Sequence, residues 1–224
     1  SSKSGAADVL SALGVNIDAD LKLVEKAMAE AGIGFLMATR HHSAMRFVGP
    51  ARVEMGIRTI FNLLGPLSNP AGVKRQFTGA FSRRWIEPMA ETLGKLGCER
   101  AWVVHGSDGL DELTTTGPSF VAELKDGAVT CFDVSPEDAG IERAESQDLK
   151  GGSPETNAAA IHALLAGEPS PYRNVVLYNA AAALMVADKA ENLKNGVAMA
   201  KKAIDGGAAK RTLDALVSIT NSAA

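Results

Sequence analysis

Cysteines and long apolar runs are scarce in this chain of 224 residues. Its two cysteines, Cys98 and Cys131, can supply neither a disulfide framework nor a metal cluster. We expect both to be small buried residues of a cytoplasmic protein. No stretch approaches the roughly 18 apolar residues of a membrane span, and the N-terminus lacks the charge and apolar order of a signal peptide. A soluble globular protein that is neither secreted nor inserted in a membrane is expected.

Several common catalytic patterns are missing as well. None of the four histidines stands at a zinc-ligand interval from another histidine or a cysteine, so no zinc site is expected. Neither a Gly-x-Ser-x-Gly motif nor a Walker-type loop occurs, which removes the common hydrolase and nucleotide triphosphatase classes. His42 follows a predicted strand and could touch a substrate. For His105 we expect a buried, hydrogen-bonded position rather than the role of a general base.

Charge is unevenly distributed along the chain. The whole protein carries a net charge of −3, but the segment from Arg40 to Arg84 carries +7. Such a segment inside an acidic protein suggests a local anionic ligand. Duplex nucleic acid is not expected as a partner, because a basic balance over the whole domain is missing. The alternative is that these basic side chains lie on solvated faces that never meet.

Apolar periodicity predicts alternating helices and strands. Strands are expected at 33–38, 76–81, 101–105, 120–124 and 128–132, the last two joined by a tight turn at Asp126-Gly127. Helices are expected at 4–13, 20–29, 87–96, 155–166, 174–187 and 191–206, with an interrupted helical pattern over 43–64 and a rigid connector over 65–72. This alternation is typical of an α/β layer architecture.

The most distinctive local feature is the segment 103–112, an apolar strand that opens into a glycine-spaced loop. Asp108, Asp111 and Glu112 fall within five positions of that loop. Magnesium is often held by one or two carboxylates together with substrate phosphates, so this loop is a candidate metal site. A solvated Asp-Gly turn with a helix-capping acid explains the same residues without a metal.

Five motifs together resemble the anthranilate phosphoribosyltransferases, which belong to the nucleoside phosphorylase and phosphoribosyltransferase family. They occur in family order along nearly the whole chain. The motifs are Ser-Ser-Lys-Ser-Gly-Ala-Ala-Asp-Val-Leu at 1–10, His-His-Ser-Ala-Met at 41–45, Arg-Thr-Ile-Phe-Asn-Leu-Leu-Gly-Pro-Leu-Ser-Asn-Pro-Ala at 58–71, the segment 104–112, and Asn-Ala-Ala-Ala-Ala-Leu at 179–184.

The resemblance implies a reaction and a fold. A phosphoribosyl group would pass from phosphoribosyl pyrophosphate (PRPP) to the amine of anthranilate, with release of pyrophosphate, in tryptophan biosynthesis. The implied fold is α/β, a mixed central sheet flanked by helices, with part of a small helical domain. We expect one phosphoribosyltransferase domain over 1–224, in which about 40–72 contribute to the helical domain and its hinge. The family is homodimeric.

The resemblance also assigns residues. It implies that Asp111 and Glu112 bind Mg²⁺. It also implies that anthranilate is bound by Arg52, His42 and Gly65. Arg52 would bind the carboxylate of anthranilate, because a planar guanidinium can donate two hydrogen bonds to a carboxylate. Ser1, Ser2 and Ala6 are implied to belong to the loop that binds PRPP. No catalytic side chain is implied, which fits a reaction whose leaving pyrophosphate is stabilised by metal and basic groups.

The chain departs from the family at its start. A Gly-Thr-Gly-Gly-Asp phosphate loop, the family's first strands and its N-terminal helices do not occur in these 224 residues. If the sequence is complete, we expect weak PRPP binding and little turnover. A pyrimidine nucleoside phosphorylase and a non-catalytic binding module of the same fold are the alternative interpretations.

Overall fold

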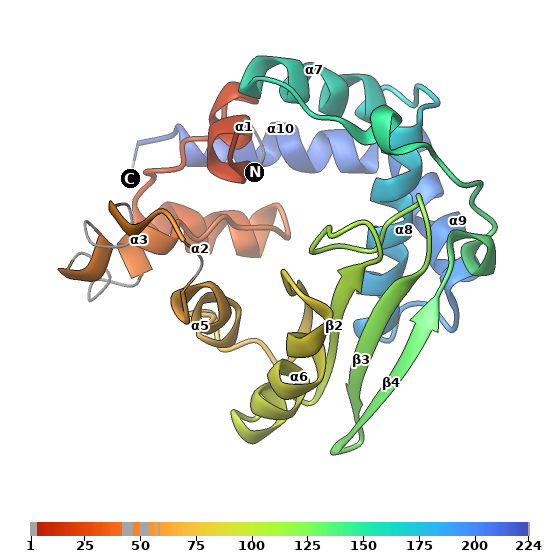
Figure 1. Cartoon of the computed structure of the whole chain (residues 1–224). Helices are drawn as coiled ribbons and strands as arrows, with labels where there is room; N and C mark the ends of the chain where they lie inside the picture. Colours follow the sequence, from red (N-terminus) through yellow and green to blue (C-terminus); the bar gives the residue numbers. More distant parts are fainter. Residues whose placement is uncertain (1–3, 42–46, 50–53, 58, 224) are drawn as a thin grey trace. The chain divides into compact units, whose positions relative to one another are not determined.

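A computed structural model describes residues 4–41, 47–49, 54–57 and 59–223 (Figure 1). The contacts between its residues divide the chain into two compact units. Unit 1 consists of Ser1–Ile57, Lys150–Glu168 and Ala203–Ala224, and unit 2 of Arg58–Leu149 and Pro169–Lys202. The first boundary, at Ile57, falls inside the segment 40–72 for which a hinge was predicted.

Unit 2 is built on a mixed four-stranded sheet. The strands are β1 (Arg75–Gly79), β2 (Arg100–Gly106), β3 (Ser119–Lys125) and β4 (Ala128–Val134), in the order β1-β2-β3-β4. β1 runs parallel to β2, and the other two pairs are antiparallel. The parallel pair is connected through η1 (Arg83–Trp85) and α6 (Ile86–Lys95), because parallel neighbours need a crossover. The predicted α/β fold with a mixed sheet is confirmed.

A tight turn joins the last two strands. Asp126 and Gly127 both adopt positive φ, 52° and 78°. Such a turn matches the right-handed twist of the paired strands, and Asp-Gly is among the sequences that tolerate it. The hairpin was therefore predictable from a dipeptide.

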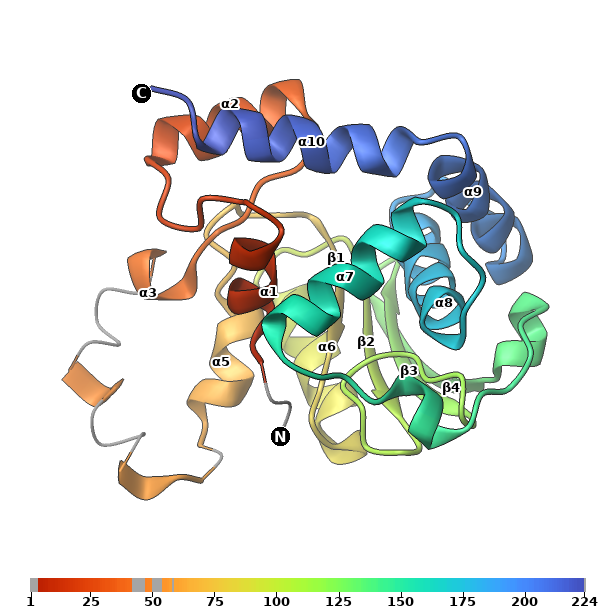
Figure 2. The same ribbon diagram turned by 90° about the horizontal axis from the view of Figure 1, so that it is seen from above.

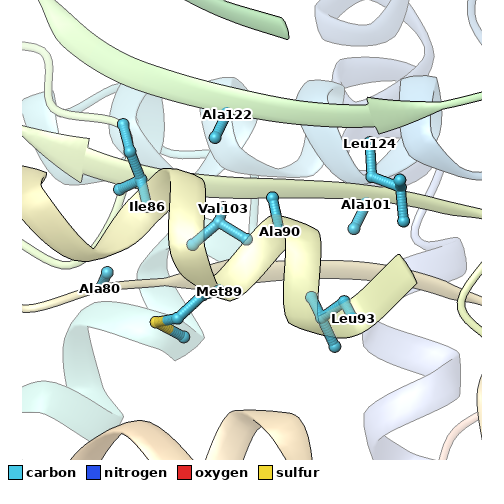
Figure 3. Packing of buried hydrophobic residues seen from close by; sticks show 9 residues of the cluster. All are labelled: Ala80, Ile86, Met89, Ala90, Leu93, Ala101, Val103, Ala122 and Leu124. Atoms are coloured by element: carbon cyan, nitrogen blue, oxygen red, sulfur yellow. The ribbon is translucent and has the colours of Figure 1, made fainter. Parts of the chain in front are cut away.

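Helix α6 covers one face of the sheet. Ile86, Met89, Ala90 and Leu93 recur at helical intervals and point toward the strands (Figure 3). They pack against alternate residues of β2 and β3, which share one face because a strand has period two. The strand members of this cluster are Ala101, Val103, Ala122 and Leu124.

Two helices rich in small residues lie on the other side. α8 (Pro171–Val186) contacts β1 and β2, and the sheet lies between α6 and α8 in both views (Figures 1 and 2). α9 (Leu193–Asp205) packs closely on α8: a Cβ at Gly196 would stand 2.7 Å from the Cα of Ala181. Small side chains permit close packing of the two helices at this contact.

Unit 1 consists of helices in the described part of the chain. They are α1 (Ala6–Ala12), α2 (Leu21–Glu30), α3 (Ala38–His41), α7 (Pro154–Leu165) and α10 (Ala208–Thr220). α1 packs on α7 and α2 packs on α10. The side chain of Asp20 caps α2 by accepting from the Lys22 amide, as its position before the apolar pattern predicts. α10 was not predicted.

The strand predicted at 33–38 is wrong. No described strand pairs with this segment, and Ile33 is 46% exposed. A strand exists through hydrogen bonds to a neighbour, so an apolar run without one forms an irregular connection. Its end, Ala38, begins the short helix α3.

Two further expectations are corrected. The predicted connector at 65–72 begins too early, because α5 (Phe61–Leu67) continues through Gly65 and Pro66. Proline lacks a hydrogen-bond donor, and at the sixth of seven positions it interrupts only the last turn.

Cys131 is exposed rather than buried, because β4 is an edge strand; Cys98 is half-buried, and both thiols are free.

The remaining described elements are two short 3₁₀ helices, η2 (Pro136–Ala139) and η3 (Ser146–Leu149). Among the helices of the described residues, none has the length and apolar character needed to span a bilayer.

Candidate active site

The acidic loop joins β2 to β3 in unit 2. Asp111 and Glu112 are both exposed, five and six residues after the strand ends at Gly106. The next residue, Leu113, is completely buried. The chain therefore presents two neighbouring carboxylates to solvent and enters the core directly afterwards.

Asp108, the third acid of the loop, has a structural role. Its Oδ2 accepts hydrogen bonds from the hydroxyls of Thr114, at 2.6 Å, and Thr116, at 2.9 Å. Its Oδ1 accepts from the Leu110 amide at 3.2 Å. These bonds close the loop on itself and occupy both oxygens. Of the three acids noted in the sequence, two remain to face a ligand.

Gly79, at the end of β1, determines how closely the loop approaches the sheet. A Cβ at this position would stand 1.6 Å from the backbone oxygen of Asp111. Any other residue would collide with the loop, so the missing side chain is what places Asp111 over the neighbouring strand. Gly79 was not among the residues predicted from the sequence. Its signal is a glycine inside an apolar strand, which often marks a close backbone approach.

Asn179 of α8 holds the other side of the acid pair. Its Oδ1 accepts from the amide of Leu113 at 2.9 Å, and its Nδ2 donates to the Leu113 carbonyl at 2.8 Å. Asn179 opens the alanine-rich motif at 179–184, to which the sequence analysis gave no separate role. The structure connects that motif with the acidic loop.

The electrostatics of the pair favour a cation. Neighbouring protein atoms displace part of the solvent around the Glu112 carboxyl, and this partial desolvation, followed by repulsion from Asp111, raises its pKa above the ordinary value of 4.5. Glu112 in turn contributes, after desolvation, to raising the pKa of Tyr172 on α8. Two carboxylates that repel each other are stabilised by a divalent ion between or beside them.

The other predicted site residues are not gathered by the described structure. Ser1, Ser2, His42 and Arg52 lie outside the described residues. Ala6 is the exposed first residue of α1 in unit 1. Gly65 is exposed in the last turn of α5 in unit 2, and open space surrounds the position of a Cβ. The Nε2 of Gln76 donates to the Pro66 carbonyl at 2.6 Å, which ties this turn to β1.

The described basic residues between Arg40 and Arg84 each have a local partner. Arg75 pairs with Asp188, and Arg83 lies over the Phe120 ring at 3.8 Å. Arg83 also lines a surface hollow of about 430 Å³ whose lining includes Glu87 and Asp133, so its positive charge there is balanced. The remaining partners are the Asp18 and Ala19 carbonyls for Arg40, the Gly97 carbonyl for Lys74 and the Trp85 ring for Arg84. Convergence of this segment on one anion stays a prediction.

His105 is hydrogen-bonded, as expected. Its Nδ1 lies 2.8 Å from the Ala80 carbonyl, and its ring stacks with Phe120 at 6.5 Å between centroids. A carbonyl only accepts, so Nδ1 carries the proton. The residue links β2 to the segment after β1 and is half-buried.

No group of three or more histidine, cysteine, aspartate or glutamate side chains that could hold a metal occurs in the part of the chain that the structure describes. A metal at Asp111 and Glu112 would therefore need ligands from water or substrate as well. This donor set suits magnesium, which usually keeps several waters and binds through one or two carboxylates plus phosphates.

Several relatives of this chain share one name. The chain is 62% identical over 219 residues to the "Anthranilate phosphoribosyltransferase" of Rhodospirillum rubrum and 64% identical over 222 residues to that of Azospirillum brasilense. These matches cover 98% and 99% of the chain, but 63% and 62% of the relatives. The chain thus spans a little under two thirds of their length.

Solved structures give the same result. The anthranilate phosphoribosyltransferase of Thermus thermophilus is 44% identical, with a TM-score of 0.90, and the match covers 97% of this chain and 65% of that one. The enzyme from Saccharomyces cerevisiae in complex with PRPP and Mg is 27% identical, with a TM-score of 0.88 over 98% of this chain and 63% of that one.

The family model described as "Glycosyl transferase family, a/b domain" matches residues 1–210. That match takes in the whole sheet, the acidic loop and Asn179. The resemblance seen in the five sequence motifs is thereby confirmed. By this match over nearly its whole length, the chain belongs to the glycosyl transferase family that this α/β domain defines.

Proposed function

We propose that this chain takes part in the transfer of a phosphoribosyl group from PRPP to anthranilate, which yields N-(5-phosphoribosyl)anthranilate and pyrophosphate in tryptophan biosynthesis. The observation that carries the proposal is the pair Asp111 and Glu112, exposed and adjacent between a strand end and a buried residue. A relative with this α/β fold binds PRPP and Mg, and another complex of the same yeast enzyme holds 4-fluoroanthranilate. The shared fold supports the same substrates for this chain.

Asp111 and Glu112 would hold the magnesium ion. Their repulsion and the raised pKa of Glu112 supply the reason for a cation, and their small number leaves ligand positions for phosphate and water. When bound, the ion neutralises charge on the departing diphosphate. The chain's own part is to hold the loop that carries both carboxylates, through the close contact at Gly79 and the hydrogen bonds of Asn179.

The remaining residues would bind and orient the substrates. Arg52 would hold the anthranilate carboxylate, with His42 and Gly65 lining its path. Ser1, Ser2 and Ala6 would belong to the PRPP-binding loop. These roles follow the family resemblance. The aromatic amine is itself a ready nucleophile, so positioning supplies the rest of the rate and no strong enzyme base is required.

The names of the relatives favour this function over a pyrimidine nucleoside phosphorylase, and the retained acid pair favours it over a non-catalytic module. We also propose a cytoplasmic homodimer. Light scattering of the natural polypeptide in solution tests the dimer.

The test of the reaction uses the natural polypeptide that contains these residues. Pyrophosphate release from PRPP is measured with anthranilate, with and without Mg²⁺. The double variant Asp111→Asn/Glu112→Gln removes both charges without changing side-chain size. Its kcat/KM is expected to fall at least about 100-fold, the scale on which lost transition-state charge stabilisation acts.

A matched control removes two exposed acids elsewhere in unit 2, Glu142→Gln/Glu145→Gln. It should retain full Mg²⁺-dependent turnover. Turnover that persists in the Asp111→Asn/Glu112→Gln variant, or that needs inorganic phosphate and a nucleoside in place of PRPP, contradicts the proposal.

A further inference from the structure

Asn179 makes a two-point amide clamp on the residue that follows the acid pair. Its Oδ1 accepts from the Leu113 amide and its Nδ2 donates to the Leu113 carbonyl. We propose that Asn179 is a positioning residue that fixes Asp111 and Glu112 in the geometry that a divalent cation requires. This inference rests on the proposed function, because it assigns the clamp a role at the same metal.

The hydrogen bonds leave Asn179 no free donor for a ligand. The second hydrogen of its Nδ2 goes to the Val175 carbonyl at 2.9 Å, one turn earlier in α8. An asparagine amide has two donor hydrogens, and here backbone carbonyls take both. This third bond also fixes the amide orientation, because a flipped amide would place its oxygen against the Val175 carbonyl. Asn179 therefore acts through the loop and not on a substrate.

The clamp is mounted on a rigid element. α8 has 16 residues, is capped by the Ser170 hydroxyl, and is buried at Tyr178, Ala181 and Ala182 on either side of Asn179. Leu113 is fully buried as well. Because its surroundings are packed, the Asn179 side chain has few alternative positions, and it therefore holds the Leu113 backbone in one place.

The acid pair is fixed from both sides. Before it, the Asp111 carbonyl rests against Gly79 of β1. After it, the Leu113 backbone is held by Asn179 of α8. The loop segment between these anchors contains only the two carboxylate residues, so the sheet and α8 together set the direction of both side chains. Partners that orient metal ligands typically change metal affinity about 10- to 100-fold when removed.

The test compares the natural polypeptide with Asn179→Leu, which keeps side-chain volume without the amide, and with Asn179→Ala. Binding of Mn²⁺ alone is measured from the electron paramagnetic resonance signal of the free ion. Exchange of the Leu113 amide hydrogen is measured by NMR. Both variants should bind Mn²⁺ about 10- to 100-fold more weakly and exchange the Leu113 hydrogen faster, while far-ultraviolet circular dichroism stays native.

Asn174→Ala, on the same helix but outside the clamp, is the matched control and should leave both readouts unchanged. Native Mn²⁺ affinity in Asn179→Leu and Asn179→Ala, together with faster Leu113 exchange, shows a purely structural bond and overturns the inference. Unchanged exchange of the Leu113 amide in both variants would show that Asn179 does not hold the loop. That result overturns the inference and leaves the proposed function unaffected. A wild-type protein that takes up no Mn²⁺ overturns the inference, whereas the proposed function is decided separately by Mg²⁺-dependent pyrophosphate release in the presence of PRPP.

Discussion

The two units of the chain are packed very differently. The largest fully buried side chains in the described residues, among them Trp102, Tyr178 and Leu113, all belong to unit 2. There one cluster joins α6 to β2 and β3. Among the described residues of unit 1, the buried hydrophobic clusters are small; one consists of Val15, Ala27 and Leu216 and another of Ala19, Leu23 and Val24.

The difference in packing bears on where a precise site can be built. In unit 2 a strand ladder, a buried helix and a glycine contact fix the loop that carries Asp111 and Glu112. In unit 1 the segment 33–37 has no strand partner among the described residues and exposes Ile33. Catalytic groups need positions held within fractions of an ångström, which dense packing on rigid elements supplies. Dense packing in unit 2 therefore suits the proposed metal site at Asp111 and Glu112.

The largest expected effect comes from Gly79→Ala. The added Cβ would overlap the Asp111 carbonyl, so the loop must move or β1 must distort. We expect a loss of about 3 kcal/mol or more in the free energy of unfolding, together with loss of Mn²⁺ binding. Denaturant titration and the free-ion resonance signal measure the two effects. The control is Gly49→Ala in unit 1, where a Cβ meets nothing within 4 Å. Equal losses of stability in both variants would show that the close contact between Gly79 and Asp111 does not cause the loss.

Core truncation compares the two units directly. Leu93 is 4% exposed in the large cluster of unit 2, and Leu23 is 6% exposed in a small cluster of unit 1. Leu93→Ala should cost about 3 kcal/mol and Leu23→Ala about 2 kcal/mol, because densely packed neighbours relax less and leave a larger cavity. The midpoints and slopes of urea unfolding measure both costs. A Leu23→Ala cost equal to that of Leu93→Ala would break the comparison.

Helix caps should show no such difference. The Ser170 hydroxyl accepts from the Arg173 amide at 3.0 Å in unit 2, and the Asp20 carboxylate accepts from the Lys22 amide at 2.9 Å in unit 1. Ser170→Ala and Asp20→Ala should each cost about 1 kcal/mol, because a cap satisfies a local donor whatever the core density. Thermal unfolding by calorimetry tests this. A several-fold larger cost at Ser170 would mean that capping of α8 also supports the Asn179 clamp.

The smallest expected effect concerns Glu112 and pH. Its pKa is raised in the folded state, so the folded protein binds the proton more tightly than the unfolded chain. Stability from this group is present at low pH and falls as the pH rises from the ordinary value of 4.5 through the raised pKa. Without metal, Glu112→Gln should therefore be slightly more stable than wild type at neutral pH and should lose that advantage in acid.

A divalent cation should reverse the stability difference between wild type and Glu112→Gln at neutral pH. Mn²⁺ needs the charged carboxylates, so it should stabilise the wild type at neutral pH and have little effect on Glu112→Gln. Unfolding midpoints across pH, with and without Mn²⁺, provide the measurement. A wild type that remains more stable than Glu112→Gln at neutral pH without metal would contradict the raised pKa.

Much of unit 2 was predictable from the sequence because its signals are local. The four strands of the sheet, α6 and the hairpin at Asp126-Gly127 follow from apolar periodicity and turn chemistry. The acid pair was identified as well, because two adjacent carboxylates after an apolar strand form a compact motif. α10 was missed, and Cys131 was expected to be buried although it lies exposed on the edge strand β4.

The contacts that position the site could not be predicted in this way. Asn179 lies 66 positions from Leu113, and Gly79 lies on a different strand from the loop that it supports. Nothing in either residue's sequence neighbourhood indicates its partner. Asp108 is similar: its spacing suggested a metal ligand, but the hydroxyls of Thr114 and Thr116 take its oxygens once the loop folds back.

The sequence by itself determined the residue types, the helix and strand periods and the pair of acids, since these depend on neighbours a few positions away. Only the tertiary structure decided that the segment 33–38 has no strand partner in the described chain, that Asp108 serves the loop, and that Gly79 and Asn179 hold the acid pair. The reason is physical: pairing, close backbone approach and a two-point amide clamp each require groups from distant parts of the chain to meet, and local periodicity contains no information about which groups those are.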